Sequence, residues 1–195
     1  MHAGPHISAM QWIAATVGLF QGLGVSYAVN CLISVFRLRK EAKFDWIPLA
    51  WMAICFILML QFWWALLELS TLVMVWTVPA FLVVISIPLS LYITVALFLP
   101  APSSQYASVW ADEFWRDGKW GMLALAYYAF AGWATNFFLF KDTSFGLAEL
   151  ALVAEFILAL AFLAVPQRGA RIAITFAYAA IIVLNLLPST PYSYG

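Results

Sequence analysis

A single charged residue, Glu68, interrupts the stretch from Trp46 to Ala111, and every other residue in that stretch is uncharged. Such a long apolar stretch fits the hydrocarbon core of a bilayer. The whole chain has the same character, since 66% of its 195 residues are hydrophobic and only 9% are charged, whereas soluble domains carry about 25% charged residues. The sequence therefore predicts an all-α integral membrane protein.

Six apolar runs are long enough to cross the hydrocarbon core, which takes roughly 20 helical residues. They are about Ser8–Phe36, two spans that share Ile47–Leu99, then Gly121–Phe140, Ser144–Val165 and Ile172–Leu187. We expect six transmembrane helices packed as a bundle in a single membrane domain, residues 1–195. Residues 1–100 form the first three-helix half, residues 101–120 a linker, and residues 121–195 the second three-helix half.

The basic residues divide unevenly between the two sides that six spans create. Lys141 alone falls on one side. The connections on the other side hold the remaining eight basic residues, which are Arg37, Arg39, Lys40, Lys43, Arg116, Lys119, Arg168 and Arg171. Because cytoplasmic loops are enriched in Lys and Arg, we expect a multi-pass protein of the cell membrane with both termini outside the cytoplasm.

The linker carries the pattern of a short amphipathic helix. Within residues 103–120, the aromatic residues Tyr106, Trp110 and Phe114 recur every four positions, with charged residues around them. A serine at the start can cap such a helix and Gly118 can end it. Aromatic residues often anchor helices at the membrane surface, so we expect this helix to lie in the cytoplasmic interface. A binding surface for a partner is the alternative.

Two pairs of segments resemble each other across the predicted halves. ELSTLVMVWTVP at Glu68–Pro79 and EFILALAFLAVP at Glu155–Pro166 both begin with Glu and end with Val-Pro. YAVN at Tyr27–Asn30 and WATN at Trp133–Asn136 both contain an aromatic residue, Ala and Asn. Three helices per half would set the halves in opposite orientations, as in many transporters. The pattern indicates a 3+3 inverted-topology repeat, with an accidental apolar match as the alternative, and places the turn between spans two and three near Thr77–Ala80.

Glu68 and Glu155 are the predicted centre of a functional site. Each lies eleven residues before the proline of its segment, or about 16 Å along a helix, near the middle of the bilayer. A charge there costs about 2.5–3.5 kcal/mol, so each carboxyl group should face the protein interior and be paired or protonated. We expect Gln61, Asn30 and Asn136 to line the same site. Structural glutamates, buried and neutral, are the alternative.

Other intramembrane polar residues are interpreted as structural. Gln21 and Asn185 are lone amides that we expect to hydrogen-bond a neighbouring helix, and Asn30 could do the same. Glu149 lies near the start of the fifth run, where the helix dipole favours an acid. Gly18–Gly22 forms a GxxxG step, which permits close helix packing.

The sequence indicates no cofactor and no metal site. Cys31 and Cys55 lie in apolar runs without CxxC spacing, as expected for buried hydrophobic residues. His2 and His6 lie in the N-terminal tail, so no histidine in the predicted spans can bind haem. Zero net charge gives no general attraction to nucleic acid. The predicted partners are the lipid bilayer, a small ion or small molecule, and a second copy or a membrane partner subunit.

The function that fits best is a small multi-pass membrane transporter or channel for protons or a small cation or solute. Its mid-membrane glutamates would be the protonatable centre. The alternative is a non-transporting accessory, scaffold or sensor subunit, in which the buried glutamates are structural. An enzyme is the weakest class, because the chain contains no HExxH, GxSxG or Walker motif.

Overall fold

The computed structural model describes residues 9–37, 40, 45–72, 77–98, 110–139 and 146–186, without the side chains of residues 9–11, 66–72 and 139. The long helices follow the apolar runs, because a helix satisfies its own backbone hydrogen bonds in a membrane. They are α1 (Ala9–Arg37), α2 (Trp46–Leu72), α3 (Val78–Phe98), α5 (Gly121–Ala134), α6 (Leu147–Ala164) and α7 (Arg168–Leu186). Between α3 and α5 lie the short α4 (Trp110–Arg116) and a 3-10 turn (Gly118–Trp120), and α5 continues into a π-helical segment (Thr135–Leu139).

Helices α1, α2, α3, α6 and α7 are each long and apolar enough to cross a membrane. This supports the predicted class, an α-helical membrane protein. The other predicted span, Gly121–Phe140, is divided between α5, whose α-helical part has 14 residues, and the π-helical segment that follows it. The total of six spans therefore stays a prediction.

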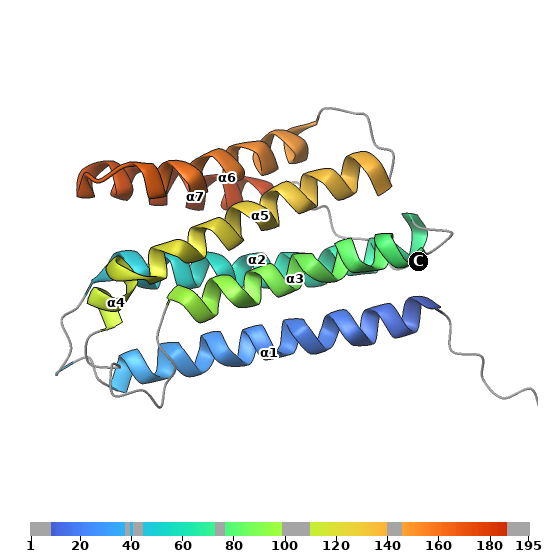
Figure 1. Cartoon of the computed structure of the whole chain (residues 1–195), viewed down its shortest axis with the longest axis horizontal. Helices are drawn as coiled ribbons and strands as arrows, with labels where there is room; N and C mark the ends of the chain where they lie inside the picture. Colours follow the sequence, from blue (N-terminus) through green and yellow to red (C-terminus); the bar gives the residue numbers. More distant parts are fainter. Residues whose placement is uncertain are drawn as a thin grey trace, which may run out of the picture.

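The long helices run back and forth between two ends of the bundle (Figure 1). We call one end the basic end, because the described residues Arg37, Arg116, Lys119, Arg168 and Arg171 lie in the segments that meet there. Helices α3 and α6 both begin at the opposite end. Helix α3 packs against α1, α2 and α5, whereas α6 packs against α5 and α7.

The two halves of the chain do not pack alike. Helix α1 packs extensively on α3, but α5 and α7, which would be their counterparts in an inverted repeat, make at most marginal contact among the described residues. The contact between α3 and α5 joins the halves instead. The structure thus does not confirm the inverted repeat.

The break between α2 and α3 lies slightly before the predicted turn. Helix α2 ends at Leu72 and α3 begins at Val78. Thr77 caps α3, since its Oγ1 accepts a hydrogen bond from the backbone N–H of Ala80 at 3.4 Å. Pro79 therefore lies in the first helical turn, where the missing N–H of proline has no intrahelical partner to lose.

The aromatic face of α4 packs against the protein, which corrects the expectation that Trp110 and Phe114 anchor in lipid, whereas the predicted position of the helix in the cytoplasmic interface stays a prediction. Trp110 is 2% exposed and Phe114 is fully buried. The ring of Phe114 packs on Phe98 of α3 and on Phe162 of α6, with centroids 5.4 and 6.3 Å apart. Tyr106 lies outside the described residues. The physical reason is that α4 packs against α3 and α6, so its aromatic side chains complete the core at the basic end.

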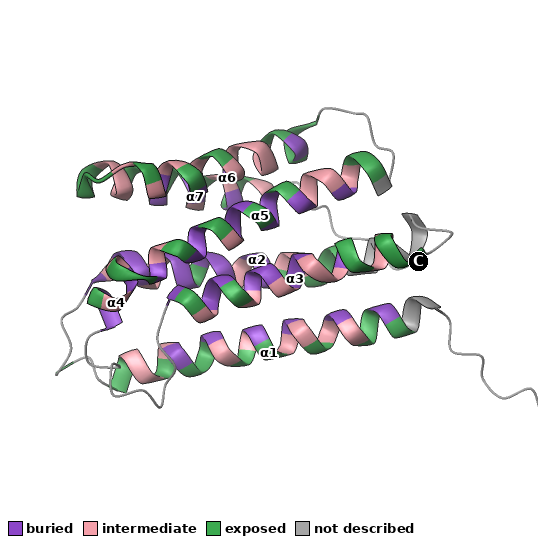
Figure 2. Cartoon of the chain, in the orientation of Figure 1, coloured by how far each residue is buried: buried purple, intermediate pink, exposed green. Residues whose placement is uncertain are grey.

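An aromatic cluster fills the bundle between its middle and the basic end. Trp51 is its centre, with ring centroids 5.2 Å from Phe162 and 4.9 Å from Tyr178. Phe98, Phe114 and Trp115 complete this cluster, whose rings meet mostly edge to face, a favoured geometry for aromatic pairs. Figure 2 shows buried residues concentrated on the inner faces of α2, α3 and α5 and in α4. The bundle is therefore tightly packed toward the basic end.

Asp45 ties three segments together beneath this cluster. Its Oδ1 accepts a hydrogen bond from the backbone N–H of Ile47 at 3.1 Å and so caps α2. Its Oδ2 accepts from Trp115 Nε1 at 2.8 Å, and Arg168 at the start of α7 lies 3.2 Å from Oδ1. Asp45 is only 6% exposed. The N-terminal ends of α2 and α7 are therefore joined to α4 through one carboxylate.

Replacing Asp45 by Ala should lower the free energy of unfolding by about 2–3 kcal/mol, because the α2 cap and the acceptor for the Trp115 indole are lost together. Asp112→Ala is the matched control, since it removes an exposed acid from α4. Thermal unfolding in detergent, followed by circular dichroism, measures both variants. Equal destabilisation by the two substitutions would contradict the role of Asp45.

Gly121 marks a close approach of α5 to α3. A Cβ at this position would lie 2.8 Å from Phe98 Cε1 and 3.0 Å from the carbonyl oxygen of Thr94. Gly121→Ala should therefore destabilise the protein by about 1–3 kcal/mol through overpacking. Gly169→Ala in α7 is the control, because a Cβ there meets nothing within 4 Å. The same unfolding measurement should leave Gly169→Ala unchanged or slightly more stable.

Candidate functional site

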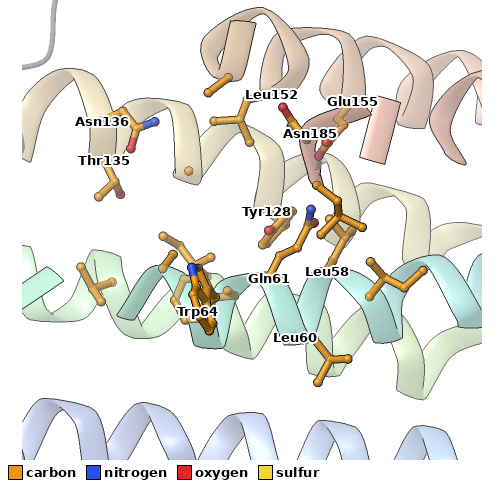
Figure 3. Close-up of a pocket in the computed structure, with 18 residues that line it drawn as sticks. Leu58, Leu60, Gln61, Trp64, Tyr128, Thr135, Asn136, Leu152, Glu155 and Asn185 are labelled. Carbon is orange, nitrogen blue, oxygen red and sulfur yellow. The ribbon is translucent and has the colours of Figure 1, made fainter. Parts of the chain in front are cut away.

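A cleft of about 880 Å³ opens between the long helices on the side of the bundle away from the basic end (Figure 3). Its walls come from α2, α3, α5, α6 and α7. Most of the lining side chains are apolar. The polar ones are Gln61, Tyr128, Thr135, Asn136, Glu155 and Asn185. A concave, mostly apolar cleft with a few convergent polar groups is the usual form of a ligand site.

Glu155 lies in the inner part of this cleft. It is 2% exposed, and its Oε2 has no hydrogen-bond partner among the described residues. The Tyr178 hydroxyl lies within hydrogen-bonding reach of this carboxyl group, and the Tyr128 hydroxyl lies close to it. The Tyr178 hydroxyl also lacks a hydrogen bond of good geometry. Buried polar groups are nearly always hydrogen-bonded, so the unsatisfied Oε2 makes Glu155 the candidate centre of the site.

One face of α6 explains where the cleft ends. Ala148, Leu152 and Glu155 line the cleft, and Ala159 is fully buried. Their spacing puts all four on the same helical stripe. Glu155 is therefore the last cleft residue before the packed core. It lies about 12–14 Å from either end of α6, given the rise of 1.5 Å per residue.

The π-helical segment after α5 supplies two polar residues of the lining. Thr135 and Asn136 are the first two residues of this segment, and both line the cleft. Thr135 Oγ1 donates to the carbonyl oxygen of Ala131 at 2.7 Å. Single π-helical turns within α-helices occur frequently at functional sites. Here the irregular turn lies beside the cleft and brings an amide to its wall.

Three of the five predicted site residues come together. Gln61, Asn136 and Glu155 line the same cleft, and Figure 3 shows Gln61 reaching from α2 toward Glu155. Asn30 lies elsewhere, on an exposed part of α1. The backbone of Glu68 belongs to α2, but its side chain lies outside the described residues, so its predicted contact with Glu155 remains untested.

Three residues of the site were not predicted to belong to it. Asn185 lines the cleft beside Glu155, although its sequence position suggested only a hydrogen bond between helices. Tyr178 precedes Asn185 by seven residues, so the two share a stripe of α7. Tyr128 is an aromatic residue among many on α5. The stripe on α7 was a detectable signal, whereas nothing in the local sequence distinguishes Tyr128.

Several structural interpretations are confirmed. Gln21 Nε2 donates to the carbonyl oxygen of Met59, which links α1 to α2. Glu149 Oε2 accepts from the backbone N–H of Gly146 at 2.9 Å and so caps α6. Cys31 and Cys55 are buried, and neither forms a disulfide within the described residues.

The GxxxG expectation is wrong within this chain, because a Cβ at Gly18 or Gly22 meets nothing within 4 Å. The close approach lies instead at Gly24, where a Cβ would lie 2.7 Å from Met59 Cε. The sequence spacing identified a stripe of small residues but not the neighbouring helix that it faces.

The lining has one acidic residue and no basic residue among the described side chains. The structure also has no group of three or more potential metal ligands in the part of the chain that it describes. The cleft can therefore bind or release a proton at Glu155, pair with one positive charge, and donate or accept hydrogen bonds through amides. No family model, curated protein or solved structure matches this chain.

The cleft should be chemically accessible down to its wall on α6. In purified protein, Ala148→Cys should react rapidly with a thiol reagent, because Ala148 is exposed and lines the cleft. Ala159→Cys is the matched control on the same helical stripe, and it should stay unreactive because Ala159 is fully buried. The buried native thiols should add little background. Mass spectrometry of the labelled protein measures the rates, and similar rates for both variants would argue against the cleft.

Proposed function

We propose that this chain is a small membrane transporter or channel that handles protons or a small cation or solute, with Glu155 as its protonatable centre. The observation that carries the proposal is the unpartnered Oε2 of Glu155 beside the cleft. An ionisable group within a membrane-spanning helix is expensive to keep and is usually functional. A purely structural glutamate would be expected to have its oxygens hydrogen-bonded.

The position of Glu155 supports a role in passage across the membrane. The cleft extends from Glu155 toward the end of the bundle where α3 and α6 begin. The aromatic cluster separates it from the basic end, where Trp51, Phe114 and Phe162 pack together. A group reached from one end and sealed from the other is what a gated pathway requires at its centre. Movement of this cluster would then open the second half of the path.

The proposed arrangement in the membrane follows from charge. The basic end would face the cytoplasm, with both termini on the other side of the cell membrane, as the positive-inside rule predicts. Six spans would include α5 with its π-helical segment. Under this arrangement the cleft opens to the non-cytoplasmic side. An inverted repeat remains part of the proposal only through the paired segments that contain Glu68 and Glu155.

Proton entry into liposomes tests this proposal directly. Purified protein is reconstituted with a trapped pH dye, and a potassium gradient with valinomycin imposes the membrane potential. Wild-type protein should carry protons faster than empty liposomes, and Glu155→Gln should abolish that excess because the protonatable group is lost. Glu68→Gln tests the predicted partner in the same assay.

Glu113→Gln is the matched control, because Glu113 lies on α4 at the basic end and pairs with Arg116 at 2.6 Å. It removes the same charge far from the cleft and should keep the wild-type flux. Wild-type protein no faster than empty liposomes would exclude proton conduction and leave coupled transport of another substrate or the accessory-subunit alternative. An undiminished flux in Glu155→Gln would remove Glu155 from the pathway.

A further inference from the structure

The chemistry of the cleft walls limits what can occupy them. Apolar side chains dominate the lining, and examples from three helices are Leu58, Leu60, Phe62, Val84, Ile87 and Leu152. The volume of about 880 Å³ matches sites for organic molecules, which span roughly 300–1,000 Å³. A proton or a hydrated metal ion uses neither the volume nor the apolar surface. The cleft therefore fits an organic molecule with a largely apolar body.

The carboxyl group in the cleft determines which charged group the molecule should carry. Glu155 carries the one carboxyl group among the described lining side chains, and no lysine, arginine or histidine joins it there. A negative ligand would find no cation there and would be repelled by an ionised carboxylate. A positive group would instead meet the unpartnered Oε2. Side-chain amides of Gln61 and Asn185 lie nearby and can accept further hydrogen bonds from it.

We propose that the cleft binds a lipophilic organic amine, with its ammonium group on Glu155 and its apolar body along α2, α5 and α6. This inference deepens the proposed function, because it names the substrate class for the same site. Aromatic rings of Trp64 and Tyr128 also line the cleft. They offer surfaces on which a cation is attracted by the ring face.

Binding of the ammonium group is expected to displace the proton that the neutral Glu155 carboxyl group carries. A carboxyl group buried in an apolar region favours its neutral form unless a cation pairs with it. The incoming ammonium ion therefore takes the place of the proton on Glu155, and that proton leaves to solvent. The titratable groups that face Glu155 are Tyr128 on α5, Tyr178 on α7 and, beyond them, Cys55 on α2. The tyrosine hydroxyls can donate hydrogen bonds to the carboxylate once it is ionised.

The test uses two fluorescent probes that share one fluorophore, dansylcadaverine with a primary ammonium group and the neutral dansylamide. Each probe is titrated with purified protein in detergent, and the signal from protein-free micelles is subtracted. Dansylcadaverine should bind wild-type protein about tenfold or more tightly than Glu155→Gln, since a charge-assisted hydrogen bond is lost. In weakly buffered solution, wild-type protein should release roughly one proton per bound amine.

Matched controls separate charge recognition from other effects. Glu113→Gln, at the basic end, should bind dansylcadaverine like the wild type. Ala65→Trp keeps Glu155 but places a bulky side chain at an exposed lining position, so it should weaken binding of both probes. If Glu155→Gln fails to fold, the Ala65→Trp variant and proton release by the wild type still decide the question.

Equal affinity of dansylcadaverine for wild type and Glu155→Gln would overturn the inference. So would binding unaffected by Ala65→Trp, or no preference for the amine over dansylamide together with no proton release. The liposome assay and the binding assay can contradict their two proposals independently. Amine binding without proton flux would refute conduction and leave the binding site standing, whereas flux without amine binding would leave the pathway and remove this substrate class.

Discussion

The basic end of the bundle depends on the carboxylate of Asp45. A buried charge is unfavourable unless it is well hydrogen-bonded, and Asp45 meets this condition through the backbone of α2, the indole of Trp115 and the guanidinium of Arg168. Holding Trp115 also positions the neighbouring Phe114 within the core. Arg171 then covers the Trp115 ring with its guanidinium carbon 4.9 Å from the centroid. Asp45 thus helps to position the aromatic cluster as well as capping α2.

Asp45 and Glu155, two of the three buried acids among the described residues, differ in their surroundings. Asp45 is surrounded by donors, so its charge is stabilised and its position is fixed. Glu155 lies in the middle of an apolar helix, and its Oε2 accepts no hydrogen bond of good geometry from a described residue. The first arrangement stabilises the folded structure. The second makes the ionised form of the carboxyl group unfavourable unless a cation pairs with it. This contrast, rather than the count of polar residues, separates the end that Asp45 holds together from the end that carries the candidate site.

Much of the helix pattern could be predicted, because apolar runs of spanning length have few other stable forms in a membrane. Gln61, Asn136 and Glu155 were expected to share a site, and they line one cleft, although Asn136 and Glu155 were chosen through an inverted repeat that the structure does not confirm. The position of Asn30 was not predictable, since periodicity identifies a helix face but not the neighbour that it meets. Helix α4 shows the same limit, because lipid-facing and core-facing aromatic stripes look identical in sequence. The partners of Asp45 lie 70 and 123 residues away, beyond any local pattern.

The one-sided cleft also has an electrical consequence. Where water enters a cleft, the solution potential extends to its inner end, so the transmembrane voltage falls mainly across the remaining sealed layer. Under the proposed arrangement that layer would be the aromatic cluster around Trp51 and Phe162. A charge that reaches Glu155 through the cleft would cross little of the field, while a charge moving past the cluster would cross most of it, about 2.3 kcal/mol for each 100 mV. The aromatic cluster would then be the insulating layer of the proposed pathway.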